Sequence, residues 1–208
     1  MQYFDNCATA MFELAAARLN NSLNDEKRDY NPLQKNKKYF KCIHYRNTDF
    51  MEKIAAAKRH LDYDAWYPKF LDVGCGVGQK VFLAGLAGFT AHGIELRKPF
   101  VKKANELLTE YDETAVYQSK KSSKSNTRVS YADGIKYTKY NEFDVIYFYR
   151  PIADDKLQEK LETKIAKDAK KGAVVVAVYS PIVFDKNHPI FIKNGWTEIE
   201  RNIFQKSH

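Results

Sequence analysis

The stretch FLDVGCGVGQK, Phe70–Lys80, constrains the fold of this chain more than any other. Its first four residues are typical of the end of a buried parallel strand. A glycine-rich turn, Gly74–Gly78, follows, and Gln79–Gly88 then has the apolar pattern of a helix that ends at a glycine. Strand, glycine turn and helix predict the entry to a nucleotide-binding βαβ unit. Glycine is needed there because the backbone must turn tightly or lie against a ligand.

The spacing of the glycines indicates the kind of nucleotide. A dinucleotide fingerprint, G-x-G-x-x-G, would need a third glycine where the chain has Gln79. The chain instead has G-x-G-x-G, preceded by Asp72. A second predicted strand, Thr90–Ile94, ends in Glu95, where a carboxylate can accept both ribose hydroxyls. The lysine pattern of a phosphate-binding loop is absent.

Together, D-V-G-C-G-V-G and the acidic end of the second strand resemble the S-adenosylmethionine (SAM) site of class I methyltransferases. The resemblance covers about residues 69–178. It implies that Glu95 holds the ribose diol and that Asp133 accepts from the adenine amino group. A glycine turn without a ligand, or an NAD site, is the alternative. The implied cofactor-binding residues are Asp72, Gly74, Cys75, Gly76, Gly78, Glu95, Leu96, Ala132, Asp133, Gly134 and Tyr149.

Two further groups are assigned from their places along the chain. Tyr149 and Arg150 lie at the end of the fourth predicted strand. They are the candidate catalytic residues, because the resemblance implies that this strand end faces the acceptor. Tyr45, in the cluster 44–46, is a candidate to close over the SAM carboxylate. Structural alternatives are that Tyr149 packs in the core, that Arg150 pairs with a surface acid and that Tyr45 merely packs. For Asp133, the alternative is a plain turn.

The order of elements predicts an α/β fold, a doubly wound and mostly parallel sheet with helices on both faces. We expect an amino-terminal helical extension over residues 1–68 and a SAM-binding domain over 69–208. One extension helix spans 3–23, and a second, capped by Asn47 or Thr48, runs to about Leu61. That second helix is predicted to bury Met51, Ile54, Ala55 and Lys58 on one face. The expected strands lie near 70–73, 90–94, 114–118 with 128–132, 143–149, 173–178 and 196–204.

The net charge of +8 raises the question of a nucleic-acid partner. The excess of basic residues is spread evenly along the chain, whereas a nucleic-acid footprint is usually a concentrated patch. Only Lys35–Lys41 and Lys120–Arg128 are locally basic. A nucleic-acid partner is therefore the less favoured alternative.

The three cysteines, Cys7, Cys42 and Cys75, are far apart and form no C-x-x-C pair. They predict neither a disulfide framework nor a metal site, and they favour a cytoplasmic setting. No apolar run approaches the roughly 20 residues of a membrane span, and the first residues lack the order of a signal peptide.

The predicted function is SAM-dependent methyl transfer to a protein side chain or a small molecule. The acceptor is not identified, because Tyr149-Arg150-Pro151-Ile152 departs from the [DNS]-P-P-[YFW] pattern of enzymes that methylate nucleobase amino groups. The run Gly76–Gln79 resembles the Rossmann-like histone-lysine methyltransferases, but those enzymes continue differently at the fourth strand. A nucleic-acid-binding methyltransferase and a catalytically silent SAM-binding partner subunit are the alternatives. The oligomeric state is not fixed by the sequence.

Overall fold

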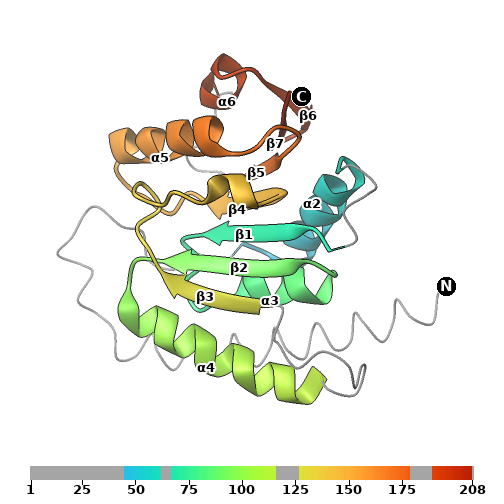
Figure 1. Cartoon of the computed structure of the whole chain (residues 1–208), viewed down its shortest axis with the longest axis vertical. Coiled ribbons are helices and arrows are strands. Elements are labelled where there is room, and N and C mark those ends of the chain that lie inside the picture. The colour runs from blue at the N-terminus through green and yellow to red at the C-terminus, as the bar shows by residue number, and fades with distance from the viewer. Residues whose placement is uncertain (1–44, 62–66, 116–126, 179–188, 208) are drawn as a thin grey trace.

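A computed structural model describes residues 45–61, 67–115, 127–178 and 189–207. Seven strands form one sheet in the order β3-β2-β1-β4-β5-β7-β6 (Figure 1). The first five strands are parallel and the last two run antiparallel to their neighbours. This confirms the predicted doubly wound sheet. The strands are β1 (Lys69–Val73), β2 (Thr90–Glu95), β3 (Thr127–Tyr131), β4 (Val145–Tyr149), β5 (Val174–Val178), β6 (Trp196–Glu200) and β7 (Ile203–Lys206).

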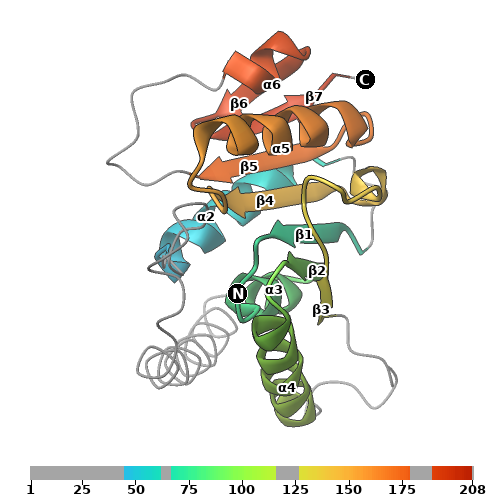
Figure 2. The same ribbon diagram turned by 90° about the vertical axis from the view of Figure 1, so that its left-hand side faces the viewer.

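The helices cover the two faces of the sheet with two separate apolar cores (Figures 1 and 2). Residues of α2, α3 and α4 share one core with β-strand residues, which we call the first face. Residues of α5, α6 and η2 share the other, the second face. The helices are α2 (Asn47–Arg59), α3 (Gln79–Leu86), α4 (Lys98–Ala115), η2 (Tyr140–Glu142), α5 (Asp155–Asp168) and α6 (Pro189–Lys193).

Strand alternation decides which polar side chains share a face. In β1, Phe70 belongs to the first core while Leu71 and Val73 belong to the second. Because successive side chains in a strand point to opposite faces, Asp72 lies on the first face. Tyr147, the partner of Asp72 on β4, belongs to the same core. The first face therefore collects polar groups next to the glycine turn.

The glycine turn has the conformation that its sequence predicts. Gly74, Gly76 and Gly78 have φ angles of 79°, 58° and 79°, a region that favours glycine. The amides of Gly74 and Cys75 both donate to the Ile94 carbonyl, at 2.8 and 3.1 Å. These bonds tie the turn after β1 to the end of β2.

Several predicted boundaries need correction. Thr114, expected to begin a strand, lies in α4, because that helix continues to Ala115. The helix cap is Arg46 instead of Asn47 or Thr48. In α2, Ala55 and Lys58 are exposed. The buried residues are Phe50, Ile54, Ala56 and Ala57, since these face the sheet. The predicted helix 3–23 and the two basic stretches, apart from Thr127 and Arg128, lie outside the described residues.

Candidate functional site

The candidate site lies at the carboxyl ends of β1 and β4, where the winding of the sheet reverses. The strand order places β1, β2 and β3 on one side of this point and β4 and β5 on the other. Ligands of open α/β sheets bind in the crevice at such a switch point. Gly74 and Pro151 meet there, because a Cβ on Gly74 would lie 2.5 Å from the Pro151 Cβ. The predicted cofactor and acceptor residues are thus neighbours.

Glu95 is held at the end of β2 by backbone amides. Its Oε2 accepts from the Gly76 amide at 3.0 Å, and its Oε1 accepts from the Arg97 amide at 2.9 Å. The Arg97 Nε donates to the same Oε1 at 3.0 Å. Only 5% of Glu95 is exposed. A carboxylate has about four lone-pair positions, so the protein occupies three and Oε2 keeps capacity for a ligand hydroxyl.

Arg97 is itself fixed by an aromatic ring. Its guanidinium carbon lies 3.6 Å from the centroid of the Phe100 ring, in the first turn of α4. This cation–π contact and the ion pair with Glu95 keep the guanidinium half-buried beside the predicted ribose position. Arg97 was not among the site residues predicted from the sequence, although a basic residue two positions after the acidic strand end is a readable signal.

Three buried polar side chains lie beside the glycine turn on the first face. Asp72 is 3% exposed, Tyr147 is 2% exposed and Lys80 is 8% exposed. Burial raises the pKa of Asp72 to about 8, against an opposing effect of the nearby Lys80 and with a further increase from Glu95. Burial also raises the pKa of Tyr147 well above its usual value. The Tyr147 hydroxyl has no hydrogen-bond partner in the part of the chain that the structure describes.

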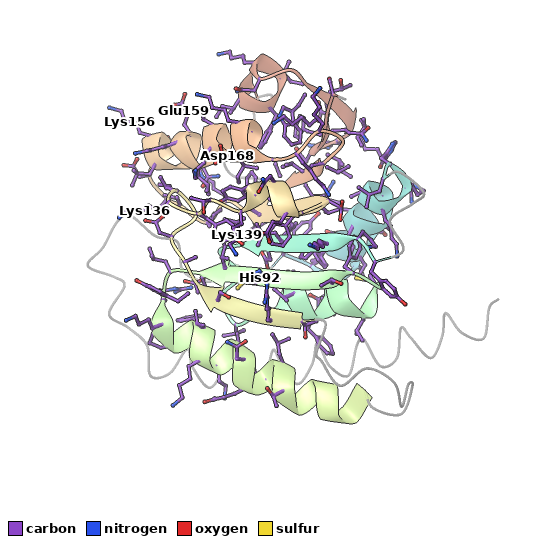
Figure 3. The ribbon with its side chains drawn as sticks, viewed as in Figure 1. His92, Lys136, Lys139, Lys156, Glu159 and Asp168 are labelled. Atoms are coloured by element: carbon purple, nitrogen blue, oxygen red, sulfur yellow. The ribbon has the colours of Figure 1, made fainter. Side chains whose placement is uncertain are left out.

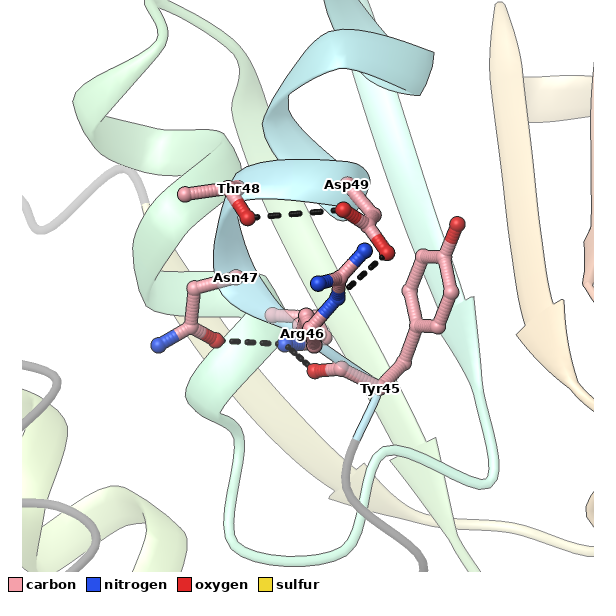
Figure 4. Close-up of polar contacts among 6 residues, drawn as sticks. Tyr45, Arg46, Asn47, Thr48 and Asp49 are labelled. Atoms are coloured by element: carbon pink, nitrogen blue, oxygen red, sulfur yellow. Dashed lines mark hydrogen bonds and ion pairs between the residues drawn. The ribbon is translucent and has the colours of Figure 1, made fainter.

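Lys80 joins the glycine turn to the segment that precedes α2. Its Nζ donates to the Tyr45 carbonyl at 2.7 Å and to the Asn47 Oδ1 at 2.5 Å, both drawn in Figure 4. The Tyr45 ring stacks on the Tyr149 ring with centroids 5.4 Å apart. Burial, followed by the charge of Asp49, raises the pKa of Tyr45 to about 12. Tyr45 therefore lies against the end of β4, as a neutral phenol.

The end of β4 is held by side chains. Arg150 has a φ of 30°, an uncommon value for a residue with a Cβ. It forms an ion pair with Asp155 in the first turn of α5, and its own side chain is only 11% exposed. The structural alternative, an ion pair with a surface acid, is present. Arg150 nevertheless lies next to Pro151, which contacts the glycine turn.

The predicted adenine end is a turn after β3. Asp133 Oδ1 accepts from the Ile135 amide at 2.9 Å, which is the turn that the alternative interpretation expects. The Gly134 carbonyl accepts from the Tyr140 hydroxyl at 2.8 Å. Leu96, Ala132, Asp133 and Gly134 are all half-buried. They therefore lie near the surface, at the ends of β2 and β3.

A polar side chain on the second face is separate from this site. His92, labelled in Figure 3, lies in the middle of β2, and its Nε2 is 2.9 Å from the Ser130 Oγ. Burial, with a contribution from Arg128, lowers the pKa of His92 to about 4. The imidazole is thus neutral near pH 7, and it lies on the face away from Asp72.

The fold and the glycine turn together define a class I methyltransferase. The chain matches the family Histone methylation protein DOT1 over residues 41–194, which is more than half of its length. It therefore belongs to the DOT1 family. No curated protein sequence matches the chain. The sequence prediction of a class I, SAM-dependent methyltransferase is confirmed at the level of family and fold.

Solved structures show the same fold at low sequence identity. The PH0226 protein of Pyrococcus horikoshii OT3 is 20% identical with a TM-score of 0.50, over 64% of this chain and 57% of that chain. The magnesium protoporphyrin IX methyltransferase of Synechocystis PCC 6803 with bound SAM is 16% identical with a TM-score of 0.55, over 72% and 68%. The YcgJ protein of Bacillus subtilis is 14% identical with a TM-score of 0.53, over 73% and 69%. The chain thus spans little more than half of the Pyrococcus protein.

Within the described ranges, none of the helices combines the length and the apolar character that crossing a membrane requires.

Proposed function

We propose that this chain binds SAM at the carboxyl ends of β1, β2 and β3 and transfers its methyl group to a protein side chain, an activity of the EC 2.1.1 type. The observation that carries this proposal is the Glu95 carboxylate, fixed by the Gly76 amide of the glycine turn. Membership of the DOT1 family supports a methyl donor of this kind. The Synechocystis enzyme of similar fold, whose structure contains SAM, supports SAM as the ligand.

The residues at the switch point fit this ligand. Glu95 Oε2 retains capacity for a ribose hydroxyl, and the positive φ angles of Gly74 and Gly76 let the backbone approach the ligand closely. The Tyr147 hydroxyl is a buried polar atom without a partner among the described residues, on the same face as Asp72. Both groups suit the polar methionine end of SAM.

When bound, SAM supplies a methyl group that its sulfonium already activates. The protein must then orient the acceptor in line with the methyl group, and orientation alone is worth about 7–11 kcal/mol in well-aligned reactions. Tyr45 would close over the methionine end of SAM and form, with the stacked Tyr149 ring, the aromatic wall between the cofactor and the acceptor. Arg150 would flank the acceptor. Tyr45, whose pKa is raised to about 12, would act as a neutral wall and not as a base.

A protein side chain is the favoured acceptor, because the family is described by histone methylation. A small-molecule acceptor is the alternative. A panel that contains core histones, other small basic proteins and metabolite pools, assayed with radiolabelled SAM, separates the two. Label in a protein band supports the proposal, and label only in the small-molecule fraction would replace it.

SAM binding is tested directly by thermal unfolding. A ligand at 100 times its dissociation constant stabilises the folded state by about 2.7 kcal/mol. We expect SAM and S-adenosylhomocysteine (SAH) to raise the Tm and NAD to leave it unchanged. A shift with NAD but not with SAM or SAH would contradict the proposal.

We further propose that residues 1–68 form an extension that completes the site and that the protein works in the cytoplasm. The position of Tyr45 against Tyr149 supports the first statement. The three dispersed cysteines, without a C-x-x-C pair, support the second. Removal of residues 1–46 and cell fractionation are the respective tests.

A further inference from the structure

We propose that Lys80 is a positioning residue, which docks the Tyr45–Asn47 segment onto the methionine end of the SAM site. This inference rests on the proposed function and concerns how the site is completed. Lys80 lies in the first turn of α3, directly after the glycine turn. Tyr45 and Asn47 lie at the start of α2, far away in the sequence but within hydrogen-bond distance of its Nζ.

The location of Lys80 is unfavourable on local grounds. The amino-terminal end of a helix carries partial positive charge, so a lysine in the first turn opposes the helix dipole. Lysine is also rarely buried unless it is paired, and only 8% of Lys80 is exposed. Residues that break local rules tend to mark functional or strained sites. The tertiary contacts of Lys80 must therefore offset these costs.

Two of Lys80's neighbours, Tyr45 and Asp72, are residues of the proposed SAM site. The Nζ donates to the Tyr45 carbonyl and to the Asn47 side chain, and it lies 5.3 Å from the Phe50 ring centroid. Figure 4 shows how the Tyr45 carbonyl and the Asn47 side chain converge from the start of α2. The ammonium also interacts with the buried Asp72, at the end of β1. One side chain thus links the base of the glycine turn to the start of α2.

The link has a consequence at the end of β4. Fixing the Tyr45 carbonyl fixes the backbone from which the Tyr45 ring projects, and that ring stacks on Tyr149. Two hydrogen bonds to protein acceptors direct the Lys80 ammonium toward this segment. Lys80 therefore acts on the cofactor through Tyr45, by holding the aromatic wall in place.

A double-mutant cycle on the full chain tests this coupling, with SAH as the probe in isothermal titration calorimetry. We expect Lys80→Met to weaken SAH binding about tenfold, since one or two charge-assisted hydrogen bonds are lost. Adding Lys80→Met to Tyr45→Ala should cause little further loss, because both changes release the same wall. Lys80→Arg, which keeps the charge, should restore most of the affinity.

Lys53→Met is the matched control. Lys53 lies in α2, and its Nζ donates to the Arg201 carbonyl at 2.9 Å, on the loop between β6 and β7. We expect SAH affinity within about twofold of wild type and an additive effect with Tyr45→Ala. If Lys80→Met fails to fold, Asn47→Ala removes one acceptor of the same ammonium and should weaken SAH binding in the same direction.

The outcomes are distinct. A wild-type chain that binds no SAH overturns the proposed function and this inference with it. A wild-type chain that binds SAH, with Lys80→Met and Tyr45→Ala losses that add in full, overturns only the positioning role. Unchanged SAH affinity in both Lys80→Met and Asn47→Ala would likewise overturn the positioning role and leave the proposed function standing.

Discussion

The two sides of the switch point hold their polar groups in different ways. On the β2 side, backbone amides of Gly76 and Arg97 fix the Glu95 carboxylate at 3.0 and 2.9 Å. On the β4 side, Tyr149 and Arg150 depend on side chains, a stacked Tyr45 ring and an ion pair with Asp155. Glu95 is 5% exposed, whereas the Asp155 side chain is 87% exposed.

This contrast explains why one side carries a recognisable motif and the other does not. A group fixed by backbone amides requires a defined turn, and the turn requires glycines at defined spacing. A group fixed by side chains can be held by many residue combinations. We therefore expect substitutions on the cofactor side to impair the protein. Substitutions on the acceptor side should be tolerated and should change which substrate is methylated.

The largest effect is expected where the two sides touch. Gly74→Ala combines a left-handed φ of 79° with a Cβ only 2.5 Å from the Pro151 Cβ. The left-handed conformation costs about 1–2 kcal/mol, and overpacking adds about 1–3 kcal/mol. Gly195→Ala, with a φ of 80° and no atom within 4 Å of its Cβ, isolates the first contribution. Urea unfolding should show a larger loss of unfolding free energy for Gly74→Ala than for Gly195→Ala. Equal losses would mean that the tight contact between position 74 and Pro151 adds no cost.

The second effect concerns the cofactor side alone. Glu95→Gln removes the charge from a carboxylate proposed to bind the ribose, and hydrogen bonds to charged groups are worth about 1.5–3 kcal/mol. We expect SAH affinity to fall by about 10- to 150-fold in calorimetric titration. Glu198→Gln is the control, because Glu198 also accepts from a backbone amide, that of Asn202 at 3.0 Å. Wild-type affinity in Glu95→Gln would show that the ribose binds elsewhere.

The cofactor side was predictable from the sequence because its determinants are local. The glycine turn and the end of β2 at Glu95 are each recognised from residues within a few positions of one another. The doubly wound, mostly parallel sheet followed from the alternation of strands and helices.

The remaining features depend on contacts between distant residues. The buried face of α2 is set by Phe50, whose ring lies 4.9 Å from Tyr147 and 6.0 Å from Phe70. The helical periodicity of the sequence alone predicted that Ala55 would lie on this buried face. Lys80 was not predicted as a site residue, because its partners lie in a distant part of the sequence. Tyr147 was not predicted either, because it lies within a continuous apolar run that indicates only a buried strand. The roles of the predicted site residues stay predictions until a ligand is bound.

A third prediction uses the pH dependence of stability to test the energetic cost of burying the Asp72 carboxylate on the cofactor side. The pKa of Asp72 is raised by burial to about 8, from an ordinary value of 3.8. Between these values the unfolded chain loses a proton that the folded chain keeps. The free energy of unfolding therefore falls as pH rises through this window, by up to about 1.4 kcal/mol per pH unit. Asp72→Asn should remove this slope between pH 6 and pH 7, and the variant should gain stability relative to wild type as pH rises. Parallel curves for the two proteins would mean that Asp72 ionises freely.

The smallest effect on stability is expected on the acceptor side. Asp155→Asn removes the ion pair with Arg150, but exposed ion pairs contribute only about 0–1 kcal/mol and are screened by salt. Glu106→Gln, which breaks the exposed pair with Lys102 on α4, should change the free energy of unfolding by a similar amount. The two variants should differ in function, because only Asp155→Asn removes an ion-pair partner of the guanidinium next to Pro151 and Tyr149. We expect Asp155→Asn to change the KM for the protein acceptor while SAH affinity stays at the wild-type value. An equal loss of SAH affinity would show that Arg150 belongs to the cofactor side, and the contrast between the two sides of the switch point would then have to be redrawn.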